Sequence, residues 1–174
     1  MTTLSQLLEP FASAIYAKAV ALRTLDLTTA QRARLLESVS DDIKKCSNFT
    51  APSVSRAALA RAEKLKVNLH DKTWHDQPRF DAGRRVFHFE HFVPVLSVRN
   101  ACLKARSKAA VLDVLKSQLR VAWILKSEDR MLTRLGYRSQ RSNPSLAYRA
   151  ANIKLAAQQA VPRDASGAAR PRRP

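Results

Sequence analysis

The chain has 174 residues, and its 31 Lys/Arg against 14 Asp/Glu give a formal net charge of +17 with a hydrophobic content of 45%. This fits one ordinary domain, and the separation of Cys46 from Cys102 argues against a zinc ribbon or a redox motif and favours two free thiols. Since there is neither a secretory leader nor an apolar run long enough to span a membrane, we expect a cytoplasmic protein with no membrane partner.

Residues 1–67 are predicted to form an N-terminal helical region. Apolar residues recur with helical spacing over 4–22, and Pro10 is expected to kink this helix or to split off its first turn. A capping-box sequence that begins at Thr28 predicts a second helix starting at the next residue. Pro52 suits the first turn of a third helix.

Residues 68–155 are predicted to form an α/β core. A loop comes first, and the aromatic and β-branched segment Val86–Val93 then predicts a strand. The short apolar run Val121–Leu125 predicts a second strand in the same sheet. Because the segment between the two strands is long enough for a helix, they are expected to pair in parallel.

Local signals define the last elements. Ser127 is expected to cap a helix that Gly136 closes, and Asn143-Pro144 opens a further short helix. Residues 156–174 are predicted to be a basic, disordered C-terminal tail. The sequence thus predicts an α+β fold that is mainly helical, with a short sheet of two or three strands.

All four histidines fall in one window of the chain, which also holds several acids and aromatic residues. Imidazole and carboxylate groups together build metal sites and general acid/base sites. On a regular strand, His88 and Glu90 would share one face, while His91 would lie on the other with Phe87 and Phe89. The polar members of the window are His70, Asp71, His75, Asp76, Asp81, His88, Glu90 and His91.

Each of these residues also has a structural interpretation. The two His-Asp dipeptides fit solvated turns, and Trp74 fits a small hydrophobic core better than a platform on which a base would stack. Phe87, Phe89 and Phe92 are predicted to be core residues, because alternation with polar residues is typical of any half-buried strand. Glu90 and His91 fit a hydrogen-bonded pair that holds no metal.

The sequence Glu90-His91-Phe92-Val93-Pro94 resembles the opening motif of HNH (His-Me finger) nucleases. The resemblance covers about fifteen residues. It implies that Glu90 helps to bind a divalent cation and that His91 is the general base that activates water for attack on a phosphodiester. His88, His75 and Asp76 are the candidates that would complete the metal ligands, and the implied ion is Mg²⁺ or Mn²⁺ rather than Zn²⁺.

Other parts of the family pattern are less well matched. Asn100 is the nearest candidate for the asparagine that orients the histidine, and the predicted helix over 108–119 offers only Asp113 as a ligand. No histidine follows His91. The motif together with the segment Trp123–Asp129 also resembles a group of uncharacterised bacterial or phage proteins.

The positive charge is concentrated in residues 81–174, which hold 19 Lys/Arg against 6 Asp/Glu. Such an excess favours binding to a phosphate backbone, DNA rather than RNA, although solubility or an anionic surface would also explain it. The candidate nucleic-acid contacts are Arg84, Arg85, Arg99, Arg138, Arg141 and Arg149.

Three functional hypotheses remain open. The first is that the chain is a metal-dependent nuclease with Glu90 and His91 as catalytic residues. The second is that it is a nucleic-acid-binding protein without catalysis. The third is an inhibitor or interaction protein whose charge meets an acidic protein surface.

Overall fold

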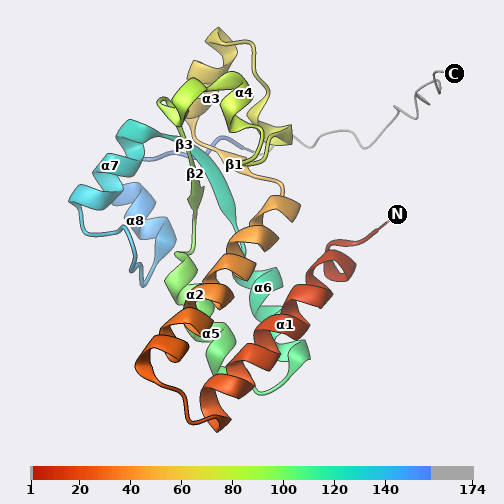
Figure 1. The fold of residues 1–174 in the computed structure, drawn as a ribbon. Helices are drawn as coiled ribbons and strands as arrows, with labels where there is room; N and C mark the ends of the chain where they lie inside the picture. The colour runs from red at the N-terminus through yellow and green to blue at the C-terminus, as the bar shows by residue number, and fades with distance from the viewer. Residues whose placement is uncertain (1, 158–174) are drawn as a thin grey trace, which may run out of the picture.

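A small mixed sheet lies at the centre of the fold, between a layer of four helices and two smaller helical groups (Figure 1). The structure is a computed structural model that describes residues 2–157. The predicted α+β fold, mainly helical with a short sheet, is confirmed. Of the predicted tail at 156–174, all but the first two residues lie outside the described part.

The strands are β1 (Ser53–Val54), β2 (Phe87–His91) and β3 (Val121–Leu125). The helices are α1 (Leu4–Thr24), α2 (Thr29–Cys46), α3 (Arg56–Lys64), α4 (Gln77–Phe80), α5 (Val95–Lys104), α6 (Lys108–Gln118), α7 (Lys126–Arg134) and α8 (Pro144–Ala150). Short 3-10 turns occupy Ser47–Phe49, Leu69–Asp71 and Ala82–Arg84.

The sheet has the order β1-β3-β2, with β1 parallel to β3 and β2 antiparallel to β3. The prediction that the two long strands pair in parallel is therefore wrong. His91, at the end of β2, lies opposite Val121, at the start of β3. The chain between them folds into two packed helices, α5 and α6, so that the second helix brings the chain back to the end of the sheet that it left.

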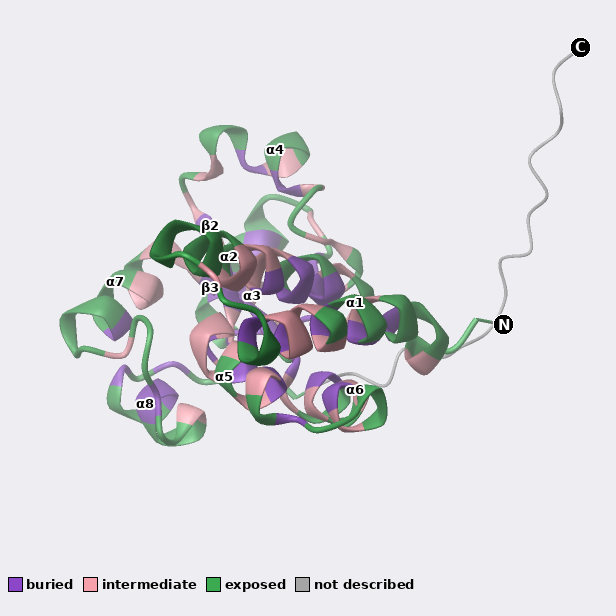
Figure 2. Cartoon of the chain, turned by 60° about the horizontal axis from the view of Figure 1, so that its bottom comes forward, coloured by how far each residue is buried: buried purple, intermediate pink, exposed green. Residues whose placement is uncertain are grey.

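The helices α1, α2, α5 and α6 form a layer below the sheet in Figure 1. Their buried side chains include Ile15, Ile43, Cys102 and Leu115, each fully or almost fully shielded from solvent. Figure 2 shows exposed residues on the outer sides of these helices. Both cysteines are free and buried in this layer. Within residues 2–157, no helix has both the length and the hydrophobicity that a membrane span requires.

A second core forms around Trp123 of β3. Its ring makes edge contacts with Phe80, Phe87 and Phe89, at centroid distances of 5.7, 6.5 and 4.8 Å. The indole N–H donates to the carbonyl of Lys72 at 3.1 Å. The prediction that the strand phenylalanines are core residues is confirmed, since Phe87, Phe89 and Phe92 are all buried.

The N-terminal elements differ from the sequence prediction at Pro52. This proline precedes β1, and α3 begins only at Arg56, where the Ser55 side chain accepts the N–H of Ala58. The capping box at Thr28 is confirmed. Helix α1 runs through Pro10.

The C-terminal elements follow their caps with one exception. Gly136 follows α7 with a φ of +81°, and the Asn143 side chain caps α8, both as predicted. The predicted cap at Ser127 is wrong, because α7 begins at Lys126 and Ser127 is already inside the helix. Glu128 caps the helix instead. The Glu128 carboxylate accepts the N–H of Leu125 at 2.7 Å and the Ser55 hydroxyl at 2.7 Å.

Asp81 fixes the chain where it enters β2. Its carboxylate accepts the backbone N–H groups of Arg85, Val86 and Phe87 at 2.9 to 3.2 Å. The Gln77 side chain donates to the same carboxylate and to the Phe87 carbonyl. Burial raises the pKa of Asp81, but these hydrogen bonds outweigh it and hold the pKa below its usual value.

We expect Asp81→Asn to lower the free energy of unfolding by about 1–3 kcal/mol at neutral pH, because an amide cannot accept all these N–H groups. A carboxylate with a depressed folded pKa adds stability above its unfolded pKa of about 3.9 and loses it as the pH falls through the folded pKa. The difference between wild type and variant should therefore shrink below about pH 4. Urea unfolding of both proteins from pH 3 to pH 7 measures this difference in the free energy of unfolding. A difference that stays constant over this range would contradict a depressed pKa for Asp81.

Candidate functional site

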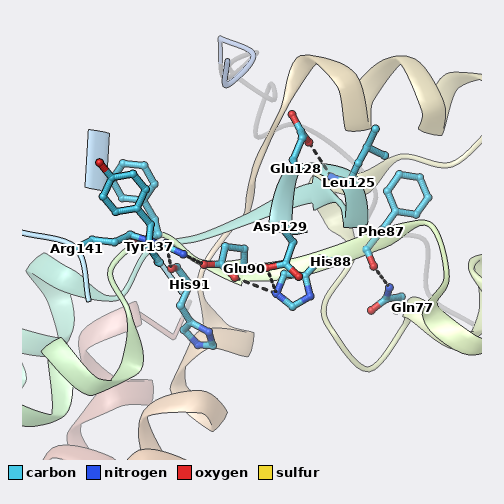
Figure 3. Close-up of polar contacts among 11 residues, drawn as sticks. Gln77, Phe87, His88, Glu90, His91, Leu125, Glu128, Asp129, Tyr137 and Arg141 are labelled. Atoms are coloured by element: carbon cyan, nitrogen blue, oxygen red, sulfur yellow. Dashed lines mark hydrogen bonds and ion pairs between the residues drawn. The ribbon is translucent and has the colours of Figure 1, made fainter. Parts of the chain in front are cut away.

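Three side chains from β2 and α7 form a polar cluster (Figure 3), and within residues 2–157 it is the one group of three or more His, Cys, Asp or Glu side chains placed to share a metal ion. The Nε2 atom of His88 lies 2.9 Å from Oε2 of Glu90 and 3.6 Å from Oδ1 of Asp129. One ligand atom from each of the three residues lies within 4.8 Å of the other two. His88 and Asp129 keep 31% and 27% of their side chains exposed, so solvent reaches the cluster.

Strand alternation and the start of α7 bring these residues together. His88 and Glu90 are two residues apart on β2 and share a face, as predicted. Asp129 lies in the first turn of α7, which follows β3 without a loop and packs on β2 and β3. The cap by Glu128 fixes where this helix begins, and therefore where Asp129 lies.

Sequence reasoning missed Asp129 as a candidate ligand. An acidic residue in the first turn of a helix interacts favourably with the helix dipole, so the position of Asp129 needed no other explanation. The available signal was its place at the end of the segment Trp123–Asp129, which begins within β3, the strand that pairs with β2.

Arg141 holds the other side of the Glu90 carboxylate. Its guanidinium donates to Oε1 of Glu90, to the carbonyls of His91 and Phe92 at 3.0 and 3.2 Å, and to the carbonyl of Tyr137 at 2.6 Å. Only 1% of the Arg141 side chain is exposed. The prediction that Arg141 contacts nucleic acid is therefore wrong, because all its donor groups face into the protein.

Glu90 remains ionised in this environment. Burial raises the pKa of its carboxyl group, but the hydrogen bonds from His88 and Arg141 and the positive charge of Arg141 outweigh burial and lower the pKa. The carboxylate therefore carries a negative charge at neutral pH and shares it between Arg141 and His88.

His91 lies on the other side of the strand, as alternation predicted. Its ring points away from the Glu90 carboxylate in Figure 3, and its Nε2 atom lies 2.7 Å from the Ser47 hydroxyl. Burial lowers the pKa of the His91 imidazole, which is therefore neutral at pH 7. The structure thus brings His91 next to α2 and does not add it to the cluster of His88, Glu90 and Asp129.

The predicted ligands His75 and Asp76 do not join the cluster either. The Asp76 carboxylate accepts the backbone N–H and the hydroxyl of Thr73, both at 2.9 Å, and so closes its own turn. His75 is exposed beside Trp74. Asn100 and Asp113 are exposed on α5 and α6.

His91 borders two hollows. One has a volume of about 390 Å³ and lies between α2 and the loop that carries Trp74 and His75. The second, of about 250 Å³, is lined by Glu90, His91, the start of α5 and Arg138. Trp74 is 43% exposed at the first hollow, so the prediction that it belongs to a small core is wrong.

The remaining candidate arginines have different environments. Arg85, Arg138 and Arg149 are exposed and free to meet a phosphate backbone. The Arg84 guanidinium lies over the Trp74 ring, 3.4 Å from its centroid. Arg99 donates to the Ser40 hydroxyl at 3.2 Å.

Comparisons of the chain with known protein families, with curated proteins and with solved structures found no match.

Proposed function

We propose that this protein binds nucleic acid and hydrolyses a phosphodiester bond with a divalent cation held by His88, Glu90 and Asp129. The observation that carries this proposal is the convergence of the three ligand atoms within 4.8 Å. It matches the resemblance to HNH nucleases in one respect: a helix that follows the paired strands supplies a ligand next to the acid of the Glu-His motif.

The donor set fits a small divalent cation. One imidazole nitrogen and two carboxylate oxygens leave further coordination positions for solvent and substrate. Mg²⁺ prefers oxygen ligands alone, whereas Mn²⁺ accepts imidazole together with carboxylate, so we expect Mn²⁺ to bind more tightly. A cation bound there would supply a Lewis acid that stabilises the charge on a phosphate oxygen.

Glu90 belongs to the cluster and also lines the smaller hollow, together with His91 and Arg138. The hollow lined by Glu90, His91 and Arg138 would seat the phosphate, with the exposed Arg138 guanidinium as its cation. Attack forms a bond from the water oxygen to phosphorus and breaks the bond to the leaving oxygen, which takes a proton from solvent. Water must lose a proton, and a neutral His91 would accept it.

Ser47 would hold the His91 ring in the required tautomer. Its hydroxyl also lies 3.2 Å from the carbonyl of Ile43. When the hydroxyl donates to that carbonyl, Nε2 of His91 carries a proton and donates to Ser47. The Nδ1 atom is then unprotonated and available to a water molecule.

The compartment and the substrate belong to the same proposal. Free cysteines in the helical layer suit a reducing compartment, so we propose a cytoplasmic site of action. The charge of +17 suits DNA as the partner.

Cleavage assays test this function. We expect the wild type to cut plasmid DNA or a single-stranded oligonucleotide in Mn²⁺, and chelation by EDTA to stop it. Asp129→Asn keeps the shape of the side chain but weakens a ligand, so the rate should fall by about a hundredfold or more. The matched control is Asp113→Asn, an exposed position on α6, which should cut like the wild type. A wild type that cuts in neither Mn²⁺ nor Mg²⁺ would contradict the proposal.

Salt dependence tests the nucleic-acid contact separately. Arg138→Ala should weaken binding about equally for all sequences and reduce the slope of log K against log salt by about 1. Arg34→Ala is the matched control, because Arg34 is already paired with Glu37 at 2.8 Å on the surface. Fluorescence anisotropy at several salt concentrations gives both slopes. Equal slopes for the wild type and Arg138→Ala would remove Arg138 from the interface.

A nucleic-acid-binding protein without catalysis is the second candidate. The buried Arg141 cation already pairs with Glu90, and its charge opposes a second cation nearby. In this interpretation His88, Glu90, Asp129 and Arg141 stabilise the fold, and the exposed arginines alone carry the function.

A further inference from the structure

The larger hollow beside His91 has the features of a site for a flat aromatic ligand. Its volume of about 390 Å³ lies in the range of small-molecule pockets, which is about 300–1,000 Å³. Aromatic and imidazole rings make up much of its wall, and two lysines of α2 also line it. The residues that line it include Lys45, Asn48, Trp74, His75, Phe89 and His91.

Trp74 is far more exposed to solvent than a tryptophan that belongs to a hydrophobic core. It is 43% exposed, whereas Trp123, the other tryptophan of the chain, is completely buried. The Arg84 guanidinium stacks on the Trp74 ring at 3.4 Å, which holds the indole in place. The ring of His75 meets it edge-on at 5.2 Å. A fixed, exposed indole at a pocket is suited to stacking on a flat ring.

Asn48 lines this pocket and carries a buried acceptor without a partner among the described residues. Its Nδ2 atom donates to the carbonyl of Lys45 at 3.3 Å, and since a carbonyl only accepts, this bond sets the orientation of the amide. The Oδ1 atom is then buried with no hydrogen-bond partner among the described residues. A buried acceptor without a partner costs free energy. A rotation of the Asn48 side chain at the pocket wall would turn Oδ1 toward a ligand N–H group and recover this cost.

The charge around the pocket selects an anionic ligand. Lys44 is paired with Asp41 at 3.0 Å, and Lys45 is exposed beside this pair without an ion pair of its own in residues 2–157. The charged residues that line the pocket, Asp41, Lys44 and Lys45, therefore carry a net positive charge. An aromatic ring with an N–H donor and an attached phosphate is a nucleotide.

We propose that this hollow binds one unpaired base of a single-stranded nucleic acid, stacked on Trp74 and hydrogen-bonded to Asn48, with Lys45 on its phosphate. The inference rests on the nucleic-acid binding of the proposed function and names its substrate class. A base inside a duplex cannot enter such a pocket without leaving its stack. Because His91 lines this hollow and also the one with Glu90 and Arg138, a bound base would place the neighbouring phosphate near the proposed cleavage site.

Binding of an oligonucleotide that carries 2-aminopurine tests this site in EDTA, so that the result does not depend on metal or cleavage. We expect the protein to quench the probe and to bind the single strand more tightly than its duplex. Trp74→Ala should weaken binding of the single strand about tenfold and abolish the quenching. Leu25→Ala, at another exposed apolar position, is the matched control and should behave like the wild type.

Asn48→Leu separates recognition from structure. The substitution removes the unpaired acceptor, so the melting temperature should stay the same or rise while oligonucleotide binding weakens. A purely structural Asn48 would lower both. Three results would overturn the proposal: tighter binding to the duplex, no quenching of 2-aminopurine in the wild type, or equal affinities of the wild type and Trp74→Ala. Loss of cleavage in Asp129→Asn with intact quenching would leave it standing.

Discussion

Arg141→Ala should destabilise the protein by about 3–5 kcal/mol, because it leaves the buried Glu90 carboxylate without its cation. The substitution also removes the donor that binds the carbonyls of Tyr137, His91 and Phe92. These carbonyls lie at the end of β2 and before α8, so the segment that leads into α8 loses its attachment to the sheet. Urea unfolding at neutral pH measures the cost.

A control and a double variant make this prediction specific. Arg138→Ala removes an exposed arginine three positions away and should change stability by less than about 0.5 kcal/mol. Replacing both charges, with Arg141→Met and Glu90→Gln together, should cost less than Arg141→Ala alone, because no buried charge is left unpaired. Equal costs for Arg141→Ala and Arg138→Ala would show that the ion pair does not stabilise the fold.

His91→Ala should reduce cleavage by about 10²–10⁴-fold if His91 is the general base. Nucleic-acid affinity should change little, because it depends mainly on scattered cationic contacts. The competing interpretation is that His91 only partners Ser47, whose hydroxyl has a second partner in Ile43. That role predicts a lower melting temperature and an unchanged cleavage rate per folded molecule.

Measuring both quantities on the same preparation separates these interpretations. Ser47→Ala is the companion variant, since it removes the hydroxyl that orients the ring and keeps the imidazole. We expect a smaller loss of cleavage in Ser47→Ala than in His91→Ala. Cleavage by His91→Ala at the wild-type rate would exclude His91 as the base.

Local signals explain which parts of the fold were predictable from the sequence. The capping box at Thr28, the glycine after α7 and the asparagine before α8 each act within a few residues, and each has the predicted role. Strand alternation also gave the correct faces for His88, Glu90 and His91.

The parts that sequence reasoning missed depend on contacts between distant residues. β1 has only two residues, and it is a strand because it pairs with β3. The pairing direction of β2 and β3 depends on how α5 and α6 pack between them. In the sequence, Arg141 cannot be distinguished from the many surface arginines. Only the folded chain brings it against Glu90, which lies 51 positions earlier.

Direct binding of Mn²⁺ tests the central claim, that His88, Glu90 and Asp129 form a cation site. Electron paramagnetic resonance of free Mn²⁺ during a titration with protein counts bound ions without requiring a substrate. We predict one strong site per wild-type chain, lost in Asp129→Asn and in His88→Ala and kept in Asp113→Asn. A wild type that binds no Mn²⁺, or an Asp129→Asn variant that binds it with the wild-type affinity, would contradict this account.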